Sequence, residues 1–299
     1  MTALDLLAAE PTKIIYRGGL KPDGSLGDVF NLAGISAGTE GVNLASGFKW
    51  PFTPHKLLSS EGASQDGATF IRSVRGVMLL ELPIAIQADT LPQFYARNDR
   101  FWRNWNSDIP GHMSWWTRYA GWQTLRLQTT DEPEPLTGVD PTADYFEAFT
   151  LSATAMLPFF LGLDEESVWS NAQGLNEGAL RLRNYTDRKG YPRYTMNGPG
   201  RFYIEDPDSD DTDLRQVQTP VLLANEELRI NTHPRRPTAR LYSPATGENG
   251  RNVWGQLQGR RWLFPLQPWS STEIRVRVEG GSTASKVIGV VTPRKSRPF

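Results

Sequence analysis

Alternating apolar and polar positions predict β-strands along most of the chain. Leu125 and Leu127 alternate with Arg126 and Gln128, and the same period of two recurs at residues 180–183 and 274–278. This spacing places the apolar side chains on one face of a strand. Further apolar runs bounded by turn-forming residues are expected to be strands; they span residues 13–16, 68–74, 77–86, 122–129, 144–156, 201–204, 218–224, 228–231, 239–242 and 262–266. The strands at 68–74 and 77–86 are expected to be joined through Arg75-Gly76.

One segment, residues 91–106, has the spacing of an amphipathic helix. Thr90 is a suitable N-cap and Pro92 falls in the first turn. The apolar residues fall on one side of the predicted helix, whereas three arginines lie away from them; the two sets are Phe94, Phe101, Trp102 and Trp105, and Arg97, Arg100 and Arg103. We expect the aromatic side to pack on a sheet and the arginines to face solvent. A helix that binds nucleic acid is the alternative.

Turn-forming residues suggest two β domains, because 27 glycines and 22 prolines interrupt the apolar runs. Residues 1–163 are expected to form a β domain with one helix, and residues 164–299 a β-sandwich of several short strands. Residues 20–54 are glycine-rich and without sustained periodicity, which predicts a long arm. Its aromatic residues Phe48, Trp50 and Phe52 are candidates for an assembly interface, since a free arm would leave them exposed.

Charge is balanced over the whole chain but not between its halves. Residues 1–163 contain 12 Lys and Arg against 17 Asp and Glu, a net charge of -5, and the remainder contains 20 against 16, or +4, which together give the total of -1. Domains of opposite sign can attract one another or their neighbours in an assembly. The longest apolar stretch, residues 151–163, is interrupted by Pro158 and is too short to span a bilayer, so no membrane is expected as a partner.

The residues that catalysis or metal binding would need do not form recognisable motifs. There are 0 cysteines, and the 3 histidines, His55, His112 and His233, lack metal-ligand spacing. The acidic segment 205–213 offers Asp206, Asp208 and Asp210 at alternate positions, which suits calcium, but its sixth and twelfth positions depart from an EF-hand. We interpret this segment as a solvated acidic turn, with a weak cation site as the alternative. No catalytic residue, cofactor or firmly bound metal is expected.

Ten tryptophans favour either extensive packing or stacking on carbohydrate. If the second domain binds sugar, the candidate contacts are Trp254, Trp262 and Trp269. Glycoside hydrolysis would need two carboxylates facing each other across a cleft, and a sequence does not show which acidic residues converge. A structural protein, a carbohydrate-binding protein and a cell-wall hydrolase are therefore the three hypotheses, in this order.

Three blocks near the N-terminus resemble minor tail proteins of phages that infect actinobacteria, which are similar to distal tail proteins. They are residues 11–20 (PTKIIYRGGL), 24–34 (GSLGDVFNLAG) and 41–47 (GVNLASG). Segments 158–162 (PFFLG), 250–254 (GRNVW), 261–265 (RWLFP) and 292–298 (TPRKSRP) resemble later parts of the same family. The match is strongest over residues 12–47 and departs most over the aromatic stretch 101–122.

The resemblance implies a mainly β fold, with an N-terminal ring-forming domain containing one helix and a galectin-like C-terminal sandwich. It implies a structural subunit of the tail tip of a siphovirus-type virion, assembled in the host cytoplasm. The expected partner is the chain itself, in a ring of six with threefold symmetry as the alternative. The other expected partners are the tail tube protein, the tape-measure protein, the central hub or fibre and other minor tail proteins. Sequence-specific nucleic acid is not expected, and no catalytic residues come with the family.

Overall fold

The computed structural model describes residues 11–62, 66–138, 140–207 and 215–299, which fold into two compact units. Unit 1 comprises Met1–Gly162 together with Ser296–Phe299, and unit 2 comprises Leu163–Lys295. The division falls next to the boundary expected at residue 163. The last four residues differ from that expectation, because they lie against unit 1 and not with the second domain.

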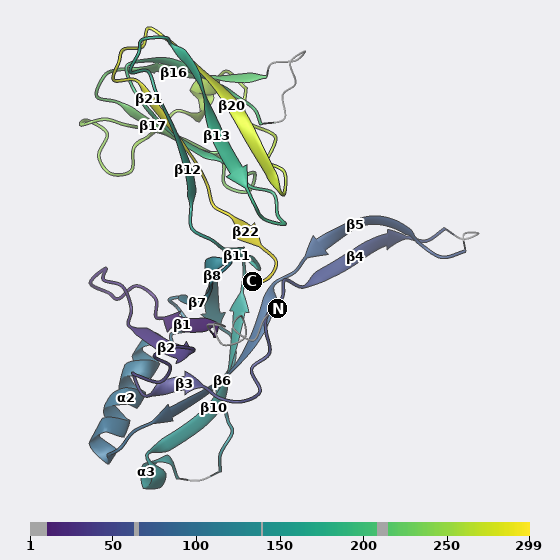
Figure 1. The fold of residues 1–299 in the computed structure, drawn as a ribbon, viewed down its shortest axis with the longest axis vertical. Helices are drawn as coiled ribbons and strands as arrows, with labels where there is room; N and C mark the ends of the chain where they lie inside the picture. The colour runs from purple at the N-terminus through teal and green to yellow at the C-terminus, as the bar shows by residue number, and fades with distance from the viewer. Residues whose placement is uncertain (1–10, 63–65, 139, 208–214) are drawn as a thin grey trace, which may run out of the picture. The chain divides into compact units, whose positions relative to one another are not determined.

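Unit 1 is built on one antiparallel sheet that nearly closes into a barrel. Its strands follow the order β2-β1-β7-β8-β10-β6-β3, and the end strands β2 and β3 lie near each other (Figure 1). The shorter β9 (Glu134–Pro135) and β11 (Phe160–Leu161) pair with β10 and β8. The main strands are β1 (Lys13–Arg17), β2 (Val29–Ala33), β3 (Val42–Leu44), β6 (Met78–Gln87), β7 (Gly111–Thr117), β8 (Gly121–Thr129) and β10 (Phe146–Ala155).

The predicted helix is α2 (Leu91–Asn104), and its aromatic side lies in the core of unit 1. The Thr90 side chain accepts a hydrogen bond from the backbone N–H of Gln93, as an N-cap does. Phe94, Phe101 and Trp105 are buried, which confirms the predicted apolar side. No helix in the described part of the chain is long and apolar enough to cross a membrane.

Phe101 lies where strands from both sides of the nearly closed sheet meet. Its ring centroid is 6.4 Å from that of Tyr16 on β1, 5.4 Å from that of Phe30 on β2 and 6.1 Å from that of Phe149 on β10. Aromatic pairs at these separations add to the free energy gained by removing their surfaces from water. The one long helix therefore holds β1, β2 and β10 around a shared aromatic core.

Polar contacts at the end of α2 fix the loop that joins β1 to β2. The Asn104 side chain accepts a hydrogen bond from the backbone N–H of Asp28 at 2.8 Å and donates one to its carboxylate at 3.1 Å. Gly18 lies so close that an added Cβ would be 2.3 Å from Oδ1 of Asn104. A Cβ on Gly27 would be 2.4 Å from the backbone of Gly18. These glycines let the loop between β1 and β2 pack closely against the end of α2. They do not indicate a flexible arm.

The predicted arm over residues 20–54 is wrong for its central part. This stretch contains β2 and β3, which pair with β1 and β6 in the barrel. Phe30, Leu32 and Val42 are fully or almost fully buried, so they stabilise the chain's own core. Short strands separated by glycine turns leave no long periodic pattern, which explains why the sequence did not reveal them.

Three further expectations also differ from the structure. The strand at residues 69–75 does not pair with the next one through Arg75-Gly76; it pairs with residues 55–60. Residues 262–266 form an irregular segment with a single bridge between Leu266 and Gly190. A second, one-turn helix, α3 (Pro141–Asp144), which was not expected, ends at the first residue of the segment predicted to be a long strand, and Asp140 caps it through Thr142.

Unit 2 is the predicted β-sandwich of two antiparallel sheets around a separate apolar core. One sheet has the order β12-β21-β14-β17-β18-β19, and the other has the order β13-β20-β15-β16. The strands are β12 (Glu165–Ser170), β13 (Glu177–Asn184), β14 (Arg193–Asn197), β15 (Gly200–Glu205), β16 (Gln216–Leu222), β17 (Glu227–Asn231), β18 (Thr238–Tyr242), β19 (Arg251–Asn252), β20 (Ser270–Glu279) and β21 (Lys286–Val291); the 3-10 helix η1 (Trp254–Leu257) and β22 (Arg294–Lys295) complete the elements.

Replacing Phe101 with Ala is expected to lower the free energy of unfolding of unit 1 by about 3–5 kcal/mol, because the ring is fully buried and its removal leaves a cavity. Urea denaturation followed by circular dichroism measures the change. Tyr95→Ala, on the exposed side of the same helix, is the matched control and should change the midpoint little. Equal effects of the two substitutions would show that α2 is not fixed through Phe101.

Asp28 makes the stability of unit 1 depend on pH. Its hydrogen bond with Lys21 lowers its pKa most; burial opposes this, and bonds from Arg100 and Asn104 lower the pKa further, to about 2. A carboxylate whose pKa is depressed in the fold stabilises it above its unfolded pKa, about 3.9, and loses that contribution as pH falls towards 2.

Asp28→Asn should therefore destabilise unit 1 at neutral pH, and the difference from the unchanged chain should vanish between about pH 4 and pH 2. Thermal melts over this range measure the effect. Asp66→Asn, on an exposed turn, serves as the control. A difference that persists at pH 2 would assign the effect to lost packing and not to charge.

Candidate assembly surface

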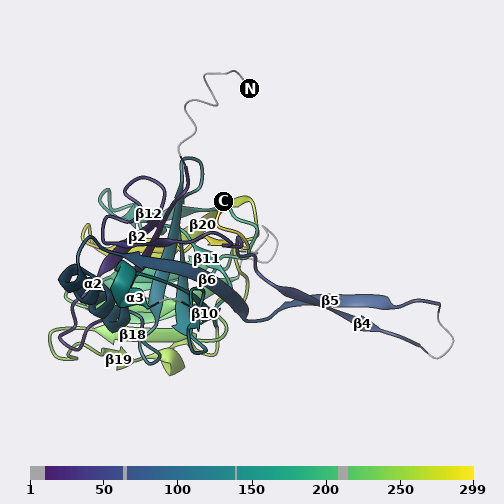
Figure 2. The same ribbon diagram turned by 90° about the horizontal axis from the view of Figure 1, so that it is seen from below.

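The most prominent surface feature of unit 1 is a hairpin that belongs to no other sheet. Strands β4 (His55–Ser60) and β5 (Thr69–Arg75) pair only with each other among the described strands. Figures 1 and 2 show this ribbon extending away from the barrel of unit 1. A two-stranded ribbon without a covering layer is at best marginally stable in water. Its outer edges also present unpaired backbone groups to any strand that approaches.

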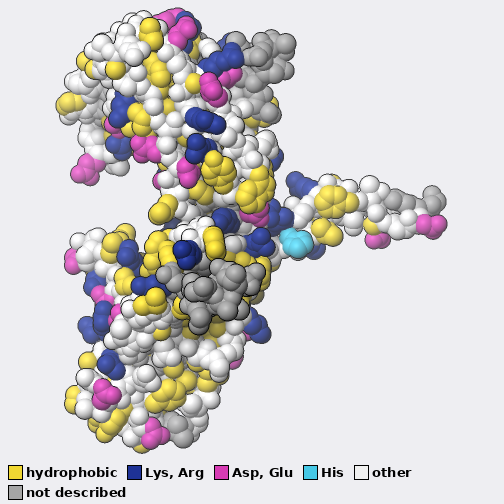
Figure 3. All heavy atoms as spheres, in the orientation of Figure 1, with side chains coloured by type: hydrophobic (Ala, Val, Ile, Leu, Met, Phe, Trp, Pro, Cys, Tyr) yellow, Lys and Arg dark blue, Asp and Glu magenta, His cyan; other side chains and the backbone are white. Residues whose placement is uncertain are grey.

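Large apolar side chains on the hairpin are exposed. Leu57, Phe70 and Ile71 are 61%, 62% and 59% exposed, and Val74 is also accessible. In the space-filling view, apolar side chains gather on the half of the ribbon nearer the barrel, with Lys and Arg beside them (Figure 3). Contiguous apolar surface of this kind is typical of a protein interface. The hairpin is therefore a candidate for contact with another chain.

A cluster of four aromatic residues lies at the base of the hairpin, and we call it the basal cluster. Phe48 contacts Trp50 with ring centroids 5.8 Å apart, and Trp50 contacts Phe299 at the same separation. Phe52 also contacts Phe299, with ring centroids 6.0 Å apart. Trp50, Phe52 and Phe299 all remain substantially exposed. The structure thus brings the three predicted interface candidates together and adds a fourth from the far end of the sequence.

Thr53 fixes the chain between the basal cluster and the hairpin. Its backbone N–H donates to the carbonyl oxygen of Ser296 at 2.9 Å, and its hydroxyl donates to the carbonyl oxygen of Pro158. The Thr53 side chain is buried. Because these bonds join Thr53 to two other segments of unit 1, at Pro158 and Ser296, they hold the base of the hairpin in a defined position on that unit.

The candidate cation site is described only at Asp206, since Asp208 and Asp210 lie outside the described residues. The Asp206 carboxylate is fully buried. It accepts hydrogen bonds from the backbone N–H groups of Leu263 and Phe264, at 2.9 and 3.1 Å, and lies 3.4 Å from Arg215. This arrangement holds the irregular segment after residue 260 in place. Cation binding by the three aspartates stays a prediction.

The three candidate carbohydrate contacts differ in accessibility. Trp262 is buried against Tyr194, with ring centroids 5.3 Å apart, so its ring is not available to stack on a sugar. Trp254 packs partly against the core of unit 2. Trp269 is 69% exposed and is the most accessible of the three. Sugar binding through Trp269 stays a prediction.

The histidines are dispersed, and no group of three metal-ligating side chains is found among the described residues. His112 and His233 each lie near arginines. Burial, followed by Arg126 and Arg17, lowers the pKa of His112, and burial with Arg294 first among the charges lowers the pKa of His233. Both histidines are therefore disfavoured as cations, and no hydrogen bond to a carboxylate of the described residues activates either of them as a base.

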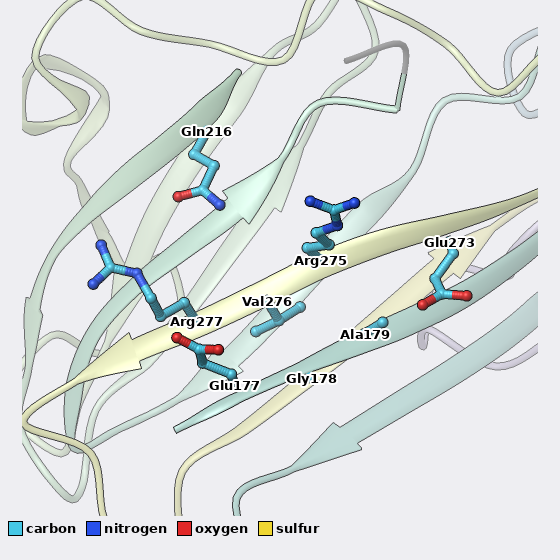
Figure 4. A pocket seen from close by; sticks show the side chains of 8 residues that line it. All are labelled: Glu177, Gly178, Ala179, Gln216, Glu273, Arg275, Val276 and Arg277. Atoms are coloured by element: carbon cyan, nitrogen blue, oxygen red, sulfur yellow. The ribbon is translucent and has the colours of Figure 1, made fainter. Parts of the chain in front are cut away.

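Unit 2 has a shallow hollow of about 460 Å³ on the outer face of its four-stranded sheet (Figure 4). The cross-strand register opposes Glu177 to Arg277 and Ala179 to Arg275, so small and charged side chains alternate there. The lining contains no serine, threonine, histidine or cysteine, and its two carboxylates, Glu177 and Glu273, are each opposite an arginine in the strand register. The lining residues are Glu177, Gly178, Ala179, Gln216, Glu273, Arg275, Val276 and Arg277. The sequence did not reveal this hollow, because it depends on strand register.

Comparisons with known proteins agree with the resemblance seen in the sequence. No protein-family model matches the chain. The chain is 22% identical to the minor tail protein Gp27 of Mycobacterium phage D29, over 91% of this chain and 95% of that protein. Its fold is similar to the Dit protein (gp 19.1) of SPP1, with a TM-score of 0.62 at 12% identity over 95% of this chain and 99% of that one.

A chain of the phage P2 baseplate, in its activated conformation with Ca, also has a similar fold. The TM-score is 0.56 at 8% identity, over 95% of this chain and 98% of that one. Both comparisons extend over both units and not over one shared domain. The predicted similarity to phage distal and minor tail proteins is confirmed, and so is the mainly β fold.

Replacing Trp50 and Phe52 together with Ser should leave unit 1 folded, since both rings are exposed, and should weaken association between copies or with a neighbouring protein. Phe48 is kept because it packs partly against the core. Native mass spectrometry reports association and circular dichroism reports folding. A folded variant with unchanged association would show that the basal cluster is not an interface.

Proposed function

We propose that this chain is a structural subunit of a phage tail tip, where copies associate into a ring between the tail tube and the central hub or fibre. The observation that supports this most is the similarity of fold along nearly the whole chain to the SPP1 Dit protein, which is described as a paradigm of the hub adsorption apparatus in phages that infect Gram-positive bacteria. The sequence similarity to a mycobacteriophage minor tail protein points in the same direction.

Ring formation is supported by surfaces that folding does not need. The hairpin residues Leu57, Phe70 and Ile71 are exposed, although burying each would contribute roughly 1.5–3 kcal/mol. A subunit that covers them with a neighbouring copy recovers this free energy and offsets the cost of association. Cyclic assemblies repeat one such contact until the ring closes. Six copies are the expected number, with three as the alternative.

The proposed role is structural and not catalytic. Among the described residues, the histidines lie apart, and the lining of the hollow on unit 2 contains no serine, threonine, histidine or cysteine. The tail tube protein, the tape-measure protein and other minor tail proteins are the expected neighbours, from the resemblance to the family. The place of action is the virion.

A first test determines location. Antibody against the purified chain should label the tip of the tail in electron micrographs of the phage that encodes it. A chain that is absent from purified virions, or labelled at the capsid, would overturn the proposed role.

A second test addresses assembly through the hairpin. Replacing Leu57, Phe70 and Ile71 with Ser should shift native mass spectra from rings to monomers, because the apolar contact is lost while no buried residue changes. The matched control replaces Leu175, Val221 and Leu223, which are similarly exposed on unit 2, and should leave rings intact. Rings that persist in the hairpin variant and dissolve in the control would assign assembly to the other unit.

A further inference from the structure

The outer face of strands β1, β7 and β8 carries two arginines with a histidine between them. Ile14, Tyr16 and Met113 point into the core, so their sequence neighbours point outward. The register places Arg17 opposite His112 and His112 opposite Arg126. Side chains in such a row follow one another at about 4.8 Å, the spacing between strands. We call this surface the cationic face.

Nothing in the described part of the chain neutralises the cationic face. Neither Arg17 nor Arg126 forms an ion pair with a described carboxylate, although unit 1 contains more acidic than basic residues. Arg17 and Arg126 are two strands apart, at about 10 Å, and like charges at this separation repel each other weakly. Burial lowers the pKa of His112 most, and Arg126 and Arg17 lower it further, so the charge of this surface comes from the two arginines. Carboxylates supplied from outside would remove this local cost.

Aromatic residues adjoin the cationic face. Trp116 on β7 and Trp122 on β8 are directly opposite each other and are half-buried, and Ile15 lies between them and the arginine row. A ligand that matches this surface needs carboxylates at one end and an apolar group at the other. Nucleic acid would provide phosphates and bases, whereas a protein segment would provide acidic and aliphatic side chains.

The chain itself presents such a segment in the turn that follows β8. Asp131, Glu132 and Glu134 are exposed, and no basic residue falls within residues 131–136. Leu136 is 52% exposed and follows directly. Glu134 lies on β9, which pairs with Phe149 and Thr150 of β10, so this turn is attached to the barrel. Acidic side chains and an exposed leucine match the two parts of the cationic face.

We propose that the cationic face of one copy binds the acidic turn, residues 131–136, of another copy, with Arg17 and Arg126 against the carboxylates and Trp116 and Trp122 against Leu136. This inference rests on the proposed function, because it names two of the surfaces through which copies would meet. Since the contact joins two different patches, it can repeat around a ring. Charge pairs across it give orientation and speed of association more than affinity.

Charge reversal tests this contact. The face variant contains Arg17→Glu and Arg126→Glu, and the turn variant contains Asp131→Lys, Glu132→Lys and Glu134→Lys. Each alone should reduce association at least tenfold, since every contact then opposes like charges. An equimolar mixture should restore association, because a reversed face meets a reversed turn and an unchanged face meets an unchanged turn. Native mass spectrometry should find equal numbers of the two variants in each assembly.

The control variant contains Arg235→Glu and Arg236→Glu, which change two exposed arginines of unit 2 and should leave association unchanged. Circular dichroism of each variant checks folding. Independently of any variant, association of the unchanged chain should weaken as NaCl rises from about 0.05 M to about 1 M, because screening shortens the reach of exposed charges.

Each other outcome overturns the inference. If the face variant loses association, the turn variant does not and the mixture brings no recovery, the cationic face binds a different acidic segment of the other copy. If association is insensitive to salt and to both variants, assembly uses other surfaces. The proposed tail-tip role is then tested separately by antibody labelling of virions. An unchanged chain that stays monomeric at low salt also contradicts the contact.

Discussion

Burial of Phe101 inside a nearly closed sheet is the interaction on which the rest of unit 1 depends. The sheet path from β2 to β3 has two free ends, and strands alone do not fill its interior. Helix α2 contributes an aromatic side chain that contacts Tyr16, Phe30 and Phe149, which come from both sides of that path. Removing these rings from water stabilises the barrel more than any single surface contact does.

The same helix positions the loops from which the outer surfaces arise. The side chain of its last residue, Asn104, accepts a hydrogen bond from the backbone N–H of Asp28. Because Gly18 has no Cβ, the chain can pass close to Asn104 at the end of the helix. Tyr16 donates its hydroxyl to the carbonyl oxygen of Asn104 at 2.8 Å. Burial also raises the pKa of Tyr16, so the phenol stays neutral and the bond persists at physiological pH. The alignment of β1, and with it the cationic face, follows from these contacts.

The sequence predicted the elements in which a period repeats over many residues. It missed the short strands that are stabilised by pairing with their neighbours in the sheet. The helix over residues 91–106 and the strands β8 and β20 were predicted because their apolar positions repeat with one period. The strands β2 and β3 have five and three residues, too few for a period, and only pairing with β1 and β6 makes them strands. Trp262 shows the converse case, since an aromatic residue in an irregular segment is buried by the surrounding fold.

The sequence identified the aromatic residues of the candidate surface, but the reason given for their role, a free arm, differs from the structure. Phe48, Trp50 and Phe52 were expected on a free arm, but they lie on a segment that Thr53 fixes to unit 1. A flexible arm would lose conformational entropy when it bound a neighbour, at about 1–2 kcal/mol for each ordered residue. A hairpin and an aromatic cluster that are already positioned lose less, so the same exposed area yields a larger net free energy of association. Surfaces that folding leaves exposed but fixes in place are therefore better suited to a repeating assembly than an arm of the same composition.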